Sequence, residues 1–168
     1  MAKELVPIGT TATDPRPGDF ILCHRKGLAS KLIRAGEYVH ERQGAVVSHA
    51  AFIETPTTLI EALTRGVVRT PLEDYQDIEY WIMRTGLPPL DRYQAVAFAQ
   101  SCVGQKYGFV VIFGVALRYL TWGEGLWFGM NGTEICSGLV GQTQVRSWAN
   151  YPVNPATITP AGLWRYYS

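Results

Sequence analysis

The amino-acid sequence predicts one α+β domain of 168 residues. Two observations lead to this expectation. Short apolar runs separated by turn-forming residues dominate the first half of the chain, with one small helix among them, and the second half has a more helical character. No repeat, low-complexity segment or change of composition marks a linker. With 47% hydrophobic residues, the chain can bury a substantial core as a single domain covering residues 1–168.

The expected strands are apolar runs that end at turn-forming residues. A Pro-Arg-Pro-Gly-Asp turn precedes the first strand, and a Thr-Pro-Thr-Thr turn at residues 55–58 joins the second and third strands. The bend at Arg65-Gly66 leads into a further extended segment. In chain order the expected strands cover residues 20–23, 46–54, 59–63, 67–70 and 80–84.

Three helices are expected: at residues 28–41, from residues 88–91 onward, and from Cys136 to near Ala149. Prolines keep the following segment from being regular until residues 163–166. These prolines are Pro152, Pro155 and Pro160.

Asp91 is the expected N-cap of the second helix, because a carboxylate there accepts hydrogen bonds from unpaired backbone N–H groups. Helical spacing then places four residues on one face, and Cys102 is expected in the middle of this helix as a core residue. The residues of that face are Tyr93, Val96, Ala97 and Val103.

Composition excludes several classes of function. A formal net charge of +1 without a strongly basic stretch gives no electrostatic case for nucleic-acid binding. The start of the sequence lacks the pattern of a signal peptide, so we expect cytoplasmic synthesis. Release without a conventional signal, for example as part of a phage particle, stays open. The most apolar stretch, residues 108–117, ends at Arg118 after ten residues and is too short to span a membrane.

Cys136 is the candidate nucleophile. A thiol in the first turn of a helix feels the positive end of the helix dipole, which can lower its pKa from about 8.5 to about 3.5–7.5. Gly132 and Gly138 permit close backbone approach, as a substrate needs at a nucleophile. The alternative role is a small buried hydrophobe, which is commoner for an intracellular cysteine. Cys102 is expected in the core and Cys23 within an apolar strand, and the three cysteines do not have the pattern of a disulfide framework.

His49 is the preferred general base among the three histidines. It lies in an apolar extended run, where an imidazole needs a reason to be buried; the alternative is a histidine bonded to a local carbonyl group. His40 is flanked by charged residues, which is typical of a solvated helix face. His24 precedes two basic residues at a strand end and is expected on the surface. Cys23 and His24 make a poor pair, because adjacent strand residues point to opposite faces.

Glu61 is the expected orienting acid, since a carboxylate inside an apolar strand is costly to bury without a partner. An even hairpin loop places Glu61 opposite Phe52, on the wrong face for His49. A three- or five-residue loop, or a β-bulge, places it near Ala51 or Ile53 and corrects the face. Glu54 is the fallback orienting group. Cysteine, histidine and carboxylate together are the parts needed for thiol-based acyl transfer.

Several motifs together resemble the NlpC-type papain-like cysteine peptidases, and more closely their circularly permuted, YiiX-like branch. Residues 136–140 match the Cys-Ser-Gly-Leu-Val helix start of that family, and Glu61 stands twelve positions after His49, as the polar residue does there. The chain order is His, Glu, Cys, as permutation implies. Weaker matches extend the resemblance over nearly the whole chain; they are residues 18–22, 106–108 and 159–163.

The resemblance implies a permuted papain-like fold, in which the Cys136 helix packs on an antiparallel sheet that carries His49 and Glu61. It implies a thiol peptidase or amidase without a metal or organic cofactor, and it suggests the Tyr107 hydroxyl as an oxyanion donor beside the backbone N–H of Cys136. It does not imply an oligomer. The family commonly cleaves short peptides of bacterial cell walls.

The resemblance leaves two substrate classes open. Relatives of the permuted branch include enzymes that act on lipid acyl groups, and the chain carries a long apolar insertion, residues 109–130, before the nucleophile. Within it, Phe109, Phe113 and Trp122 are candidate substrate-binding residues, although an apolar segment of this kind also serves as a core helix. We favour a peptide or acyl-amide substrate, with a lipid acyl hydrolase or acyltransferase and a catalytically silent binding module as the alternatives.

Overall fold

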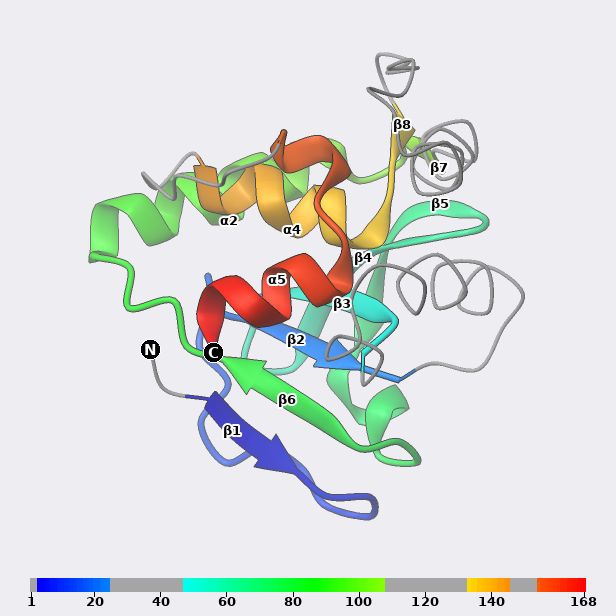
Figure 1. The fold of residues 1–168 in the computed structure, drawn as a ribbon, viewed down its shortest axis with the longest axis vertical. Coiled ribbons are helices and arrows are strands. Elements are labelled where there is room, and N and C mark those ends of the chain that lie inside the picture. The colour runs from blue at the N-terminus through cyan, green and yellow to red at the C-terminus, as the bar shows by residue number, and fades with distance from the viewer. Residues whose placement is uncertain (1–2, 25–46, 108–132, 146–153) are drawn as a thin grey trace.

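The computed structural model describes residues 3–24, 47–107, 133–145 and 154–168 (Figure 1). Within these ranges the fold is α+β, with a six-stranded antiparallel sheet, three α-helices and two short 3₁₀ helices. The strands of the sheet are β1 (Lys3–Val6), β2 (Phe20–Cys23), β3 (His49–Thr55), β4 (Thr58–Leu63), β5 (Gly66–Pro71) and β6 (Tyr80–Met83). The helices are η1 (Leu72–Tyr75), α2 (Pro89–Cys102), α4 (Cys136–Val145), η2 (Pro155–Thr157) and α5 (Pro160–Tyr167).

The sheet has the strand order β1-β6-β2-β3-β4-β5, and a short parallel pair, β7 (Lys106–Tyr107) and β8 (Thr133–Glu134), lies beyond β5. The five strands expected from the sequence are confirmed within a residue or two wherever they are described. The additional strand β1 was not expected. The helix expected at residues 28–41 lies outside the described residues, as does the expected end of the last helix near Ala149.

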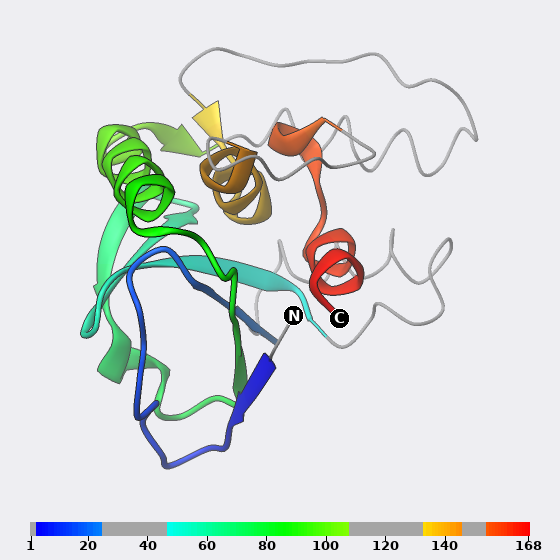
Figure 2. The ribbon, with the colours of Figure 1, turned by 90° about the vertical axis from the view of Figure 1, so that its left-hand side faces the viewer.

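Two hydrophobic clusters lie on opposite faces of the sheet. Even-numbered residues of β2 and β3, such as Phe20 and Phe52, pack against α2, α4 and α5. Odd-numbered residues of the same strands, such as Ile21 and Ile53, pack against η1. The alternation of side chains along a strand produces this division. Figures 1 and 2 show the three α-helices gathered on one side of the sheet, with η1 on the other.

Helix α2 begins three residues earlier than an Asp91 cap implies, and its buried face differs. Pro89 is its first residue, where a missing N–H costs no hydrogen bond, and Pro88 occupies the N-cap position in place of Asp91. The buried residues are Ala95, Ala99 and Cys102, so Cys102 is a core residue at the end of the helix and not in its middle.

The face that was predicted for α2 is therefore wrong. Tyr93 is 72% exposed and Ala97 is exposed, whereas Val96 and Val103 are only partly buried at the margin of the core. The small side chains of Ala95 and Ala99 are instead the ones that α2 buries in the core shared with the sheet and α4.

The C-terminal segment is more regular than its prolines suggested. Pro155 and Pro160 each occupy the first turn of a helix, where proline is well tolerated. Asn154 and Thr159 cap these helices by accepting hydrogen bonds from the N–H groups of Ala156 and Gly162. Helix α5 therefore begins three residues before the expected Leu163.

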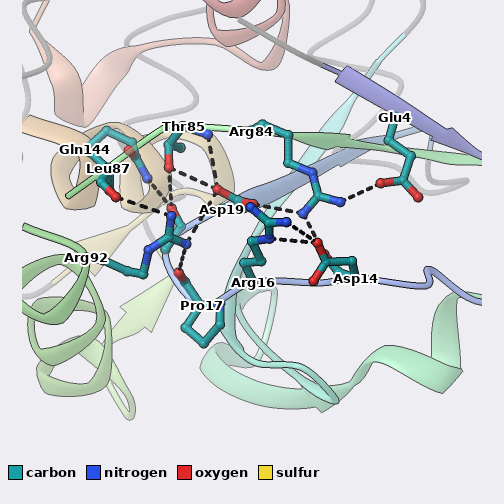
Figure 3. A network of polar contacts seen from close by, with 11 residues as sticks. Glu4, Asp14, Arg16, Pro17, Asp19, Arg84, Thr85, Leu87, Arg92 and Gln144 are labelled. Carbon is teal, nitrogen blue, oxygen red and sulfur yellow. Dashed lines mark hydrogen bonds and ion pairs between the residues drawn. The ribbon is translucent and has the colours of Figure 1, made fainter. Parts of the chain in front are cut away.

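A buried polar network ties α4 to the sheet (Figure 3). Asp19 Oδ1 accepts hydrogen bonds from the backbone N–H and the hydroxyl of Thr85, at 3.1 and 3.0 Å, and Asp19 Oδ2 accepts one from Arg84 at 3.1 Å. The amide of Gln144, two turns after the start of α4, donates to the carbonyl of Gly18 at 3.1 Å. The bond from Gln144 therefore joins α4 to the turn that precedes β2.

Candidate active site

Cys136, His49 and Glu61 are brought together by three different elements. Cys136 is the first residue of α4, His49 the first residue of β3, and Glu61 lies inside β4. All three are buried, with exposed fractions of 2%, 6% and 0%. Three ionisable side chains can be buried in this way only if they bind one another or other polar groups.

The side chains of His49 and Glu61 form a direct hydrogen bond. Nε2 of His49 lies 2.6 Å from Oε2 of Glu61. With Nε2 bound to a carboxylate, Nε2 carries the ring proton and Nδ1 is the nitrogen that can exchange a proton with another group.

A β-bulge makes this contact geometrically feasible. The hairpin turn pairs Thr55 with Thr58, but the register then shifts, so that Ile53 pairs with Leu59 and Phe52 with Ile60. The shifted register carries Glu61 beside Ala51, on the same face as His49 and diagonal to it. Of the alternatives considered for this hairpin, the bulge is the one observed.

The thiol of Cys136 is the other partner of His49. The two side chains are hydrogen-bonded, and the backbone N–H groups of Ala50 and Ser137 also donate to the sulfur. Ala50 follows His49 in β3, and Ser137 follows Cys136 in α4. These hydrogen-bond donors stabilise a negative charge on the sulfur.

Ionisation in this group follows from burial and charge. Burial raises the pKa of the Cys136 thiol, but the charge and hydrogen bond of His49 and the two backbone donors lower that pKa below its usual value. Burial lowers the pKa of His49, but the Cys136 thiolate and the Glu61 carboxylate outweigh it and raise the pKa to about 9. The pair therefore favours the thiolate–imidazolium form at neutral pH.

The Glu61 carboxylate has further polar neighbours that the sequence did not suggest. The Tyr75 hydroxyl donates to Glu61 Oε2 at 2.7 Å, and the Thr70 side chain is a second neutral group that favours the charged carboxylate. Burial alone raises the pKa of Glu61, but His49, Thr70 and Tyr75 together lower it to about 2. Tyr75 is in η1 and Thr70 in β5, so their proximity to Glu61 depends on the pairing of β4 with β5.

Glu54, the fallback orienting group, binds Arg69 and Gln100. It accepts two hydrogen bonds from Arg69 Nε, a third from Arg69 Nη2 and a fourth from Gln100 Nε2 at 2.9 Å. It is an even-numbered residue of β3, and its partner Gln100 belongs to α2, on the helix-covered face. Glu54 is therefore not the partner of His49.

The remaining cysteines and histidines are placed as follows. All three cysteines lie within the described ranges, where they are buried and form no disulfide. Cys23 is directly opposite His49 in the β2–β3 pair, a proximity that the sequence did not indicate. His24 is exposed, and its Nδ1 lies 3.4 Å from the Ser48 hydroxyl. His40 lies outside the described residues.

The candidate oxyanion and substrate residues are only partly described. The backbone of Tyr107 belongs to β7, but its side chain is outside what the structure describes. Phe109, Phe113 and Trp122 lie outside the described residues altogether.

Two further properties concern ligands and membranes. In the described part of the chain, no three His, Cys, Asp or Glu side chains gather into a set that could hold a metal ion. No described helix is both long enough and apolar enough to cross a bilayer.

Comparison with known proteins leaves the family unassigned. No protein-family model and no curated protein sequence matches the chain.

Gly138, beside the nucleophile, has a packing role that differs from the one expected. A Cβ at this position would collide with the carbonyl oxygen of Ala156 and would lie 2.8 Å from Cγ1 of Ile135. One turn further along, a Cβ at Gly141 would lie 2.5 Å from the carbonyl oxygen of Pro155. These glycines let η2 approach α4 closely, so the close backbone approach is internal to the protein.

Substitution of Gly138 by alanine is expected to destabilise the protein by about 2 kcal/mol, because backbone and not a flexible side chain would have to move. This loss exceeds the gain in helix propensity of about 1 kcal/mol. Chemical denaturation measures the difference. Gly162→Ala is the matched control, since its nearest neighbour is a side-chain atom, Ile158 Cγ1 at 3.0 Å. A Gly138→Ala protein as stable as the control would contradict the packing role.

Proposed function

We propose that the protein is a cysteine hydrolase that cleaves amide bonds through an acyl-enzyme. Cys136 is the nucleophile, His49 the general base and Glu61 the acid that orients His49. One observation carries the proposal: a single buried imidazole lies between a buried carboxylate and a thiol at the start of a helix. A purely structural site has no need to bury three ionisable groups in mutual contact.

The proposed reaction begins from the ion pair in which the proton of the Cys136 thiol already resides on Nδ1 of His49. The thiolate attacks the substrate carbonyl carbon, and the resulting tetrahedral intermediate collapses when His49 donates the proton to the leaving amine. Water, deprotonated by His49, then attacks the thioester and releases the acid and the free thiol. Throughout, Glu61 holds the Nε2–H tautomer and stabilises the imidazolium.

Stabilisation of the oxyanion is assigned to backbone N–H groups at the start of α4. The first N–H groups of a helix have no partner inside the helix, and they carry the positive end of its dipole. The backbone N–H of Cys136 is the first donor, and the Tyr107 hydroxyl is the second donor that the family resemblance suggests.

The same proposal extends to the fold and the substrate. An antiparallel sheet with His49 and Glu61 on adjacent strands, followed in the chain by the Cys136 helix packed against them, supports the permuted papain-like arrangement. Short peptides of bacterial cell walls are the proposed substrates, by resemblance to the family. Comparing muropeptide-like peptides with a series of acyl esters tests this choice: good cleavage of lipid esters beside untouched peptides would overturn it.

Mild alkylation tests the nucleophile without knowledge of the substrate. At pH 6, iodoacetamide is expected to modify Cys136 at least about tenfold faster than Cys23 or Cys102, because the charge and hydrogen bond of His49 and the N–H groups of Ala50 and Ser137 lower the pKa of the Cys136 thiol. Mass spectrometry of digested protein at timed intervals measures the three rates. Because all three thiols are buried, access alone does not favour Cys136. Equal rates would refute the proposed nucleophile.

A further inference from the structure

Oε2 of Glu61 is shared by two donors. His49 Nε2 lies 2.6 Å from it and the Tyr75 hydroxyl lies 2.7 Å from it. Glu61 and Tyr75 are both fully buried, with 0% exposure, so bulk water cannot replace either donor.

We propose that Tyr75 is a positioning residue for the His49–Glu61 pair: its hydroxyl holds the Glu61 carboxylate charged and oriented, with Oε2 directed at Nε2 of His49. This inference rests on the proposed function, because it concerns how the base of that reaction is held. Tyr75 touches neither the sulfur nor the reacting atoms, and it acts only through Glu61 and His49.

The rigidity of Tyr75 makes it suited to this role. It ends η1, which follows β5 directly, and its ring packs edge-on against Tyr80 with centroids 6.1 Å apart. A ring held on several sides places its hydroxyl in one position. A carboxylate on a flexible glutamate side chain has three rotatable bonds, and a fixed external donor removes much of that freedom.

Few groups face the Glu61 carboxylate in the described part of the chain. His49 approaches from β3, Tyr75 from η1 and Thr70 from β5, and Cys136 of α4 lies beyond His49. Only His49 among them carries a positive charge. The charged state of Glu61 therefore depends on His49, on the Tyr75 hydroxyl and, to a smaller extent, on the nearby Thr70 side chain, since burial opposes it.

Substitution of Tyr75 by phenylalanine removes the hydroxyl and keeps the ring. Glu61 then loses a donor to its charged form and takes up a proton at higher pH, which releases His49 from its anchor. The rate of Cys136 alkylation falls as the solution becomes acidic, and this falling part of the pH profile is called the acid limb. In the variant its midpoint is expected to move to higher pH by about one unit, which corresponds to the loss of one hydrogen bond to a charged group. Iodoacetamide rates measured by mass spectrometry between pH 3 and pH 8 give the limb.

Tyr80→Phe is the matched control. Tyr80 is equally buried, at 1% exposure, and its hydroxyl accepts from the backbone N–H of Ala12 and not from the site. A merely structural role for Tyr75 predicts that both variants lose some stability and that neither moves the acid limb. Thr70→Val provides a second variant, with a smaller shift expected in the same direction.

The outcomes separate this inference from the proposed function. A normal acid limb in Tyr75→Phe and Thr70→Val, beside a reactive Cys136 in the unmodified protein, would overturn the positioning role alone. An unreactive Cys136 in the unmodified protein would remove the proposed function, and the inference with it. A shifted limb in Tyr75→Phe with an unshifted limb in Tyr80→Phe is the expected result.

Discussion

Replacement of His49 by alanine is expected to lower the alkylation rate of Cys136 at pH 6 by about 10²–10³-fold. Without the imidazolium, burial raises the pKa of the thiol and only the N–H groups of Ala50 and Ser137 oppose it. A thiol with a pKa near 9 is only about one part in 10³ thiolate at pH 6. Because the pKa moves upward, the loss is largest in acid and shrinks as the pH approaches 9.

Iodoacetamide rates at Cys136 from pH 5 to pH 10 measure this effect. His24→Ala is the control, since His24 is the other described histidine and is exposed; it should leave the Cys136 rate within about twofold, because no contact with the sulfur is lost. Similar losses in both variants would mean that His49 does not control the thiol. Hydrolysis by His49→Ala should fall by at least the same factor, because the variant also lacks the proton donor for the leaving group.

Replacement of Glu61 by glutamine is expected to lower the pKa of His49 from about 9 by about one to two units, because a hydrogen bond to a carboxylate becomes one to a neutral amide. The direction follows from the cause: the carboxylate favours the charged imidazolium, so its loss favours the neutral ring. Proton exchange between Cys136 and His49 then becomes less favourable at neutral pH. Chemical shifts of the labelled His49 ring, followed through a pH titration, measure the change.

The same substitution should cost about 3 kcal/mol of stability, since it breaks a buried charged pair. Glu54→Gln is the matched control, because Glu54 is a buried carboxylate on the adjacent strand whose partners are Arg69 and Gln100. It should lose stability and leave the His49 titration unchanged. An unchanged His49 titration in Glu61→Gln would contradict the assignment of Glu61 as the orienting acid.

The sheet was largely predictable from the sequence, because its central strands are apolar and end at strong turn formers. Strand β1 was missed because its Lys-Glu-Leu-Val sequence is half charged; it lies at the edge of the sheet, where Leu5 remains 48% exposed. The start of α2 was misjudged because Asp91 is a good cap in isolation, whereas Pro89 already fits the first turn. In both cases the local sequence favoured a different local structure from the one that the folded protein adopts.

The candidate site was predictable only in part. Cys136, His49 and Glu61 each stand out as polar groups in apolar or helix-start contexts, and that is a local signal. Tyr75 has no such signal, because it lies in a Leu-Glu-Asp-Tyr segment typical of a surface turn. Its role arises from the folding of η1 against the sheet, which no local pattern encodes. The packing role of Gly138 was missed for the same reason.

The bulge in β3 sets the pairing register of the β3–β4 hairpin, and this register decides on which face of the sheet Glu61 lies. The turn that pairs Thr55 with Thr58 alone would place Glu61 opposite Phe52, among the residues that face α2 and α4, and the single extra residue transfers it to the other side of the sheet. Insertion or deletion of one residue between Ile53 and Thr58 would therefore separate Glu61 from His49, even though every residue of the candidate site is retained. When sequences of this kind are compared, the parity of this hairpin is as informative as the identity of the histidine and the glutamate.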